Sequence, residues 1–252
     1  MRESHRAGND YRWGGVKTVV TSIFLSLVLT GLVRAAEAPP LAHAAMGAPN
    51  GCFVETVSLL DDYVDAAGAS AWARMLQWGA TEEEEVVAGH AVAVVEAKGK
   101  LWCWDTNFGW SAMTVPLAKR DDVAAVAAPL TARYPAISPK SPLYRFDFPQ
   151  APAAAAKPSR TGADGPAKTV AAKLSRHRPV NLVEFSYREG GATKRSAAVV
   201  FLFHGRYCIY TAEKGTVPFL RGTGSVQLTT RITASLRRLF TGGVTGVESV
   251  GW

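Results

Sequence analysis

The sequence predicts an α+β protein made of two compact units, and three patterns lead to that prediction. One helical stripe of apolar residues runs from Phe53 to Ala67. Alternating apolar segments separated by two-residue turns predict antiparallel strands in both halves of the chain. A segment rich in proline and alanine, residues 149–168, lies between these two groups of elements and predicts a linker.

The composition is that of a globular protein. The chain has 252 residues, of which 48% are hydrophobic and 19% are charged, and this balance excludes a disordered or coiled-coil protein. Its three cysteines are too few for a small disulfide-stapled fold, and their spacing predicts no structural zinc site. The four glutamates at 82–85 predict a solvated charged segment, because consecutive carboxylates cannot converge on one ion from a single face. No metal site is expected.

The first 35 residues have the three-part pattern of a secretory signal. The apolar run 19–33 is short for a bilayer-spanning helix, and Val33 and Ala35 suit cleavage after Ala35. We therefore expect residues 1–35 to be a signal peptide and the protein to be exported, either to a periplasm or out of the cell. The alternative is an uncleaved segment that anchors the chain. The basic residues before the run are Arg2, Arg6, Arg12 and Lys17.

The formal net charge of +7 is divided unevenly along the chain. Residues 36–156 contain 8 basic and 14 acidic residues, whereas residues 157–252 contain 15 basic and 5 acidic residues. We expect an acidic domain at 45–148 and a basic, β-rich domain at 169–252. Either the two dock on each other, or the basic domain carries the acidic one to an anionic envelope polymer. Nucleic-acid binding is not expected, because the basic half has no recognisable nucleic-acid motif.

A reactive cysteine is predicted at the start of the first helix. Apolar residues at 53, 57, 60, 64 and 67 form one stripe, Asn50 suits an N-cap, and Gly68 suits the position after the last turn. Cys52 then lies in the first turn, where backbone N–H groups and the helix dipole favour a thiolate. The alternative is that Cys52 is a small buried apolar residue.

A hairpin downstream brings a histidine and an aspartate together. If Lys98-Gly99 is a two-residue loop, facing residues have numbers that sum to 197, so Val92 faces Asp105 and His90 faces Asn107. His90 and Asp105 are then diagonal neighbours on one face. A cysteine nucleophile needs a base, and the base needs a third group to orient it. Cys52, His90 and Asp105 can fill these roles, with Asn107 as a competing orienter.

This region resembles the transglutaminase-like branch of the papain-like cysteine enzymes over about residues 50–110. The resemblance rests on a Cys–His–Asp order, with the cysteine at a helix start and the other two on adjacent strands. The segments that carry it are Gly51-Cys52, Leu59-Leu60, Ala67-Gly68, Gly89-His90-Ala91 and Asp105.

The resemblance implies a papain-like first domain and acyl transfer through a thioester on Cys52. His90 would act as base and then as acid, Asp105 would hold it, and no cofactor would be needed. We therefore expect an exported cysteine hydrolase or acyltransferase that acts on amide or peptide bonds of a peptide or protein substrate. The alternative is a non-catalytic envelope-binding protein that retains the fold.

The basic half predicts strands and one helix. Residues 230–240 have the spacing of an amphipathic helix. Cys103 and Cys208 both fall in predicted strands, and export would allow a disulfide bridge between them; the alternative is two buried free thiols. Turns at Gly190-Gly191 and His204-Gly205 separate three predicted strands, which are Val180–Tyr187, Ala197–Phe203 and Arg206–Thr211.

Overall fold

The computed structural model describes residues 39–82, 85–133, 143–149, 165–221 and 228–249. Residues 40–252 form one compact unit. The predicted signal peptide, residues 1–35, lies outside the described residues. Within the described part of the chain, no helix is both long enough and apolar enough to cross a membrane.

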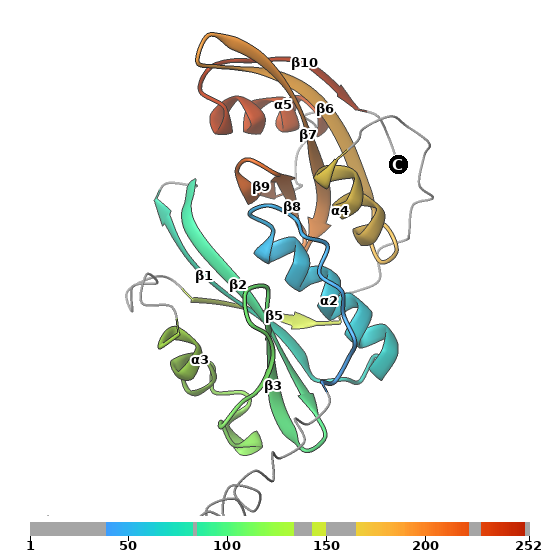
Figure 1. Ribbon diagram of the computed structural model, residues 1–252, viewed down its shortest axis with the longest axis vertical. Helices are drawn as coiled ribbons and strands as arrows, with labels where there is room; N and C mark the ends of the chain where they lie inside the picture. The colour runs from blue at the N-terminus through green and yellow to red at the C-terminus, as the bar shows by residue number, and fades with distance from the viewer. Residues whose placement is uncertain (1–38, 83–84, 134–142, 150–164, 222–227, 250–252) are drawn as a thin grey trace, which may run out of the picture. The chain divides into compact units, whose positions relative to one another are not determined.

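The predicted α+β class is confirmed, with two five-stranded antiparallel sheets (Figure 1). The first sheet has the order β4-β3-β2-β1-β5 and consists of β1 (Ala73–Glu82), β2 (Glu85–Ala97), β3 (Lys100–Asp105), β4 (Gly109–Ala112) and β5 (Leu143–Phe148). The second has the order β10-β6-β7-β8-β9 and consists of β6 (Val180–Glu189), β7 (Ala192–Phe203), β8 (Arg206–Thr211), β9 (Gly215–Arg221) and β10 (Val244–Ser249). The helices are α2 (Cys52–Ala67), α3 (Val123–Thr131), α4 (Pro166–Leu174) and α5 (Leu228–Leu239), with a short 3-10 turn at Leu117–Lys119.

Helix α2 is the central element of the unit. Its core cluster contains residues from both sheets and from α4, so the helix is covered on more than one face (Figure 1). The predicted end of the helix is confirmed, because Gly68 follows its last residue and donates its N–H to the carbonyl of Val64. The predicted start is off by one residue: Gly51 is the N-cap, and Asn50 has a positive φ of 51° that places it in the preceding turn.

The β2–β3 hairpin has the predicted register. Lys98 and Gly99 both have positive φ, as a tight two-residue hairpin loop requires, and the paired positions from Ala93 with Trp104 to Ala97 with Lys100 sum to 197. The pairing with β3 stops there, and β2 continues beside β1. Strand β1 was not predicted, although it lies between β2 and β5 in the sheet.

The second sheet contains the three predicted strands and two more. The turns at Gly190-Gly191 and His204-Gly205 connect β6, β7 and β8 as expected. Helix α5 covers the predicted helical segment, and its Ile232 and Leu236 are buried. Pro166 begins α4, so the last residues of the predicted linker are helical, and residues 150–164 lie outside the described part of the chain. The split into two domains at this linker stays a prediction.

The two remaining cysteines do not form the bridge that export would allow. Cys103 and Cys208 are both free and buried. They pack in different apolar clusters, Cys103 with the side of the first sheet that faces α3 and Cys208 in the core around α2. The structure therefore has the alternative arrangement, two buried thiols.

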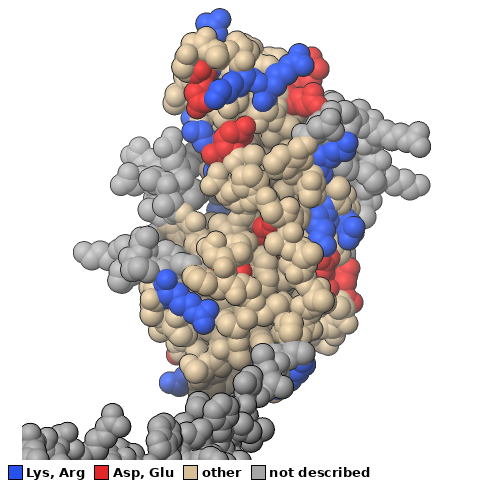
Figure 2. All heavy atoms as spheres, viewed as in Figure 1, with Lys and Arg blue, Asp and Glu red and all other residues tan. Residues whose placement is uncertain are grey.

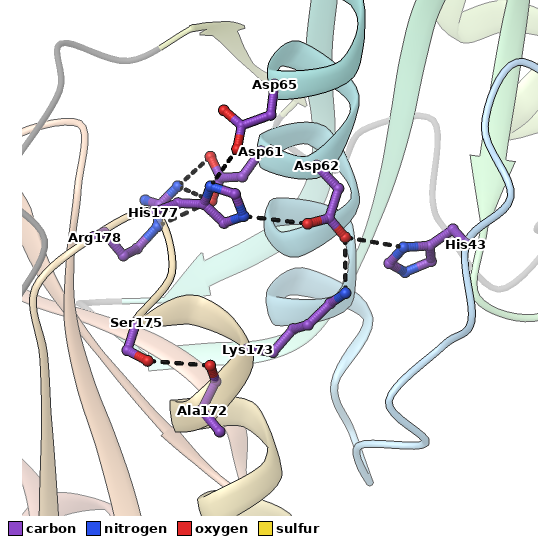
Figure 3. A network of polar contacts seen from close by, with 9 residues as sticks. All are labelled: His43, Asp61, Asp62, Asp65, Ala172, Lys173, Ser175, His177 and Arg178. Atoms are coloured by element: carbon purple, nitrogen blue, oxygen red, sulfur yellow. Dashed lines mark hydrogen bonds and ion pairs between the residues drawn. The ribbon is translucent and has the colours of Figure 1, made fainter. Parts of the chain in front are cut away.

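Acidic side chains of α2 pair with basic side chains of the second half (Figure 3). Arg178 is buried and binds Asp61 through Nε and Nη2, while its Nη1 donates to the carbonyl of Leu202 at 3.1 Å. Asp62 accepts from Lys173 Nζ at 2.8 Å and contacts His177 Nε2 at 3.2 Å. Helix α2 of the acidic part of the chain thus forms ion pairs with residues of the basic part.

The surface of the second half carries both signs of charge. Figure 2 shows Lys and Arg beside Asp and Glu over the end that holds β6, β7 and α5. One such neighbouring pair is Lys194 and Glu189 on the β6–β7 hairpin, and both side chains are exposed. On this face the positive charges are therefore interspersed with acids.

We expect the Arg178–Asp61 pair to be essential for stability. Arg178→Met would leave Asp61 buried without its partner and should lower the unfolding free energy by about 3–5 kcal/mol. Lys194→Met is the matched control and should leave it almost unchanged, because that pair is exposed. Chemical denaturation measures both values. A loss in Arg178→Met no larger than in the control would contradict the importance of the buried pair.

Candidate active site

Cys52 is the first residue of α2, and its side chain is half-buried. One turn later, Thr56 Oγ1 donates to the carbonyl of Ala91 at 3.2 Å, which joins the start of the helix to β2. The Cys52 Sγ lies 3.9 Å from the carbonyl oxygen of Gly89. The helix start is therefore held beside the strand segment that carries His90.

His90 and Asp105 form the contact that the hairpin predicts. His90 Nε2 lies 2.6 Å from Asp105 Oδ2, and their side chains are 12% and 1% exposed. His90 also hydrogen-bonds the Cys52 side chain. The three side chains are thus linked in the order Cys52, His90 and Asp105.

Asp105 is fixed by the turn that follows it. Strand β3 ends at Asp105, which pairs with Gly109 across the turn to β4. Its Oδ1 accepts the backbone N–H of Asn107 at 2.7 Å, so both carboxylate oxygens have partners. Asn107 lies in the turn between β3 and β4, beyond the last paired residues of β2 and β3, so it does not face His90 as the hairpin register predicted. The backbone of Asn107 orients Asp105, and Asn107 lines a cleft together with Cys52 and His90.

The environment of His90 favours its protonated form. Burial alone lowers the pKa of His90, but the hydrogen bonds to Asp105 and Cys52 and the negative charges of both groups raise it. The net result is a pKa raised from 6.5 to about 9. An imidazolium therefore stands beside the sulfur at neutral pH, where it can balance the charge of a thiolate.

A cleft of about 770 Å³ opens over this group. Both halves of the chain line it: Cys52, His90, Thr106 and Asn107 come from the first half, and the second half supplies Glu213–Thr216, which comprises the end of the β8–β9 turn and the first two residues of β9. Gln77 of β1 also lines it, and sequence reasoning missed this residue. The available signal was a polar residue between the apolar Leu76 and Trp78.

The turn before Cys52 is tightly built. The buried carboxylate of Glu55, in the first turn of α2, accepts the N–H groups of Met46 at 2.9 Å and Ala48 at 3.0 Å. A Cβ on Gly51 would lie 2.4 Å from the Cβ of Ala48, so only glycine fits there. These contacts fix the path by which the chain enters the helix at Cys52.

Neither of the other two thiols is suited to chemistry. Burial raises the pKa of Cys103 and of Cys208 to about 12, which keeps both thiols protonated. In the part of the chain that the structure describes, no group of three His, Cys, Asp or Glu side chains is arranged to hold a metal ion.

Comparison with known proteins identifies no relative of this chain. The chain matches no protein-family model, no curated protein and no solved structure at a significant level. The interpretation of the site therefore depends on its geometry and on the resemblance of residues 50–110.

We expect the pKa of His90, followed by NMR of the imidazole, to lie near 9 in the native protein and to fall toward 6.5 in Asp105→Asn. Because folding raises this pKa, His90 contributes stability that is complete below pH 6.5 and is lost as the pH rises through about 9. Asp105→Asn should flatten the loss of stability in that window. A native His90 that titrates near 6.5 would contradict the charge network.

Proposed function

We propose that the chain is an exported papain-like cysteine hydrolase or acyltransferase that acts on amide or peptide bonds of a peptide or protein substrate. The observation that carries the proposal is the position of His90, which is hydrogen-bonded to Asp105 on one side and to Cys52 on the other. Nucleophile, base and orienting group within hydrogen-bond reach are the signature of covalent acyl transfer.

In the proposed reaction, Cys52 Sγ attacks the carbonyl carbon of the scissile amide, and the thiol proton resides on His90. As the C–N bond breaks, His90 gives that proton to the leaving amine, and a thioester remains on Cys52. A water molecule or an amine then attacks the thioester while His90 takes its proton. Water yields a carboxylic acid and an amine yields a new amide; in both cases the C–S bond breaks, and the sulfur leaves as a thiolate with the proton again on His90.

Two groups in the cleft are suited to stabilise the oxyanion. Cys52 is the first residue of α2, so its backbone N–H has no carbonyl partner within the helix. Gln77 lines the same cleft, and its side-chain amide is a neutral N–H donor. A preorganised donor of this kind contributes about 3–4 kcal/mol of transition-state stabilisation in acyl-transfer enzymes.

The cleft supports a peptide-sized substrate rather than a small buried one. It is open to solvent, and much of its lining is glycine or alanine, which lets an extended chain approach the backbone closely. Those small residues are Ala45, Gly47, Ala48, Gly51, Gly89, Ala91 and Gly215.

The proposal is tested by trapping the acyl-enzyme with p-nitrophenyl acetate and locating the acetyl group by mass spectrometry. We expect it on Cys52, with the acetylation rate lowered about 10²–10⁴-fold in His90→Ala and about 10²–10³-fold in Gln77→Ala. Cys103 and Cys208 are the internal controls and should remain unmodified. An unmodified Cys52, or a His90→Ala variant acetylated at the native rate, would exclude the enzyme and favour the envelope-binding alternative.

A further inference from the structure

We propose that Tyr210 and Asn50 are positioning residues for Cys52, and that the β8–β9 turn of the second sheet holds the chain segment from which Cys52 enters its helix. The inference rests on the proposed function of Cys52. It assigns to the second half of the chain a direct part in the site.

Tyr210 reaches the segment from β8. Its ring lies in the core around α2, and its hydroxyl donates to the carbonyl of Pro49 at 2.9 Å. Burial, with the nearby charges of Glu55 and Glu213, raises the pKa of Tyr210 above its ordinary value of 10.0, so the phenol remains a donor. The partner of this bond lies only three residues before Cys52.

Asn50 makes the complementary contact from the segment itself. Its φ of 51° is in the left-handed region, which asparagine tolerates better than most residues. The Asn50 side chain reaches the β8–β9 turn. There its Nδ2 donates to the carbonyl of Ala212 at 2.9 Å and lies 3.4 Å from the carbonyl oxygen of Glu213.

The two backbones are also in close contact. A Cβ on Gly215 would lie 2.9 Å from the carbonyl oxygen of Asn50, so the turn and the segment approach more closely than a side chain allows. Glu213–Thr216, which includes this glycine, lines the cleft over Cys52. The turn is therefore a wall of the cleft and a support for the segment.

The segment is thus held from two sides. Glu55 binds the N–H groups of Met46 and Ala48 from within α2, and the second sheet binds Pro49 and Asn50 from outside. If the outer contacts are lost, the half-buried residue Cys52 at the very start of α2 can shift while the buried turns behind it stay in place, and the sulfur moves relative to His90. Misplacement of a reacting atom by about 1 Å can cost about 10²-fold in rate.

The test uses the full chain with Tyr210→Phe and Asn50→Gly, which remove the donors but keep the ring and the backbone conformation. Tyr63→Phe is the matched control: Tyr63 is also buried and donates to the carbonyl of Glu96 at 2.7 Å, but it lies three turns from Cys52 in α2. Hydrogen exchange is measured at the backbone amides of residues 46–48, 50 and 51, together with acetylation of Cys52 as a function of pH.

We expect both variants to exchange faster at these amides and to slow acetylation of Cys52 by about 10–10²-fold. In a plot of acetylation rate against pH, the fall of the rate at high pH should move below pH 9, because His90 loses part of its contact with the sulfur. Tyr63→Phe should do none of these, even if its melting temperature falls equally. Native exchange in both variants, or faster exchange with a native acetylation rate and profile, would overturn the inference. If the variants exchange faster but Cys52 of the native protein is not acetylated, the second sheet still holds residues 46–51 in place, and only the proposed enzymatic function is rejected.

Discussion

The burial of helix α2 between two sheets is the constraint on which the site depends. Its first three turns are buried on nearly every side, and even the polar residues Glu55, Thr56 and Ser58 are inside. A helix packed in this way can move only if the core on both sides moves with it. Cys52 is the first residue of this helix, so the core that stabilises the fold also fixes the sulfur.

The other groups of the site stand on strands of the first sheet. His90 belongs to β2 and Asp105 ends β3, and the turn after β3 supplies the backbone N–H that holds the second oxygen of Asp105. Each group is therefore positioned by sheet pairing rather than by a long loop, which suits catalysis that needs fixed geometry. The hydrogen bonds and charges of Asp105 and Cys52 raise the pKa of His90, so the protonation of His90 depends on the carboxylate of Asp105.

Short sequence patterns predicted helices and hairpins whose conformation depends on residues close together in the chain. The spacing of five apolar residues predicted α2, and the Lys98-Gly99 turn predicted the register that brings His90 near Asp105. Contacts between distant segments were not predictable, because no local pattern encodes them. Gln77 was missed together with strand β1, and Asn107 was misplaced because β3 turns immediately after Asp105. The bond from Tyr210 to Pro49 joins residues 161 positions apart.

The central claim is that His90, held by Asp105, keeps Cys52 reactive. The most direct measurement is the rate constant for alkylation of Cys52 by iodoacetamide at pH 7, compared with a free model thiol and with the same protein carrying His90→Ala. The structure predicts alkylation faster than that of the model thiol, and slower by at least about tenfold in the variant. Alkylation of native Cys52 at the rate of the free thiol, unchanged by the loss of His90, would contradict the claim.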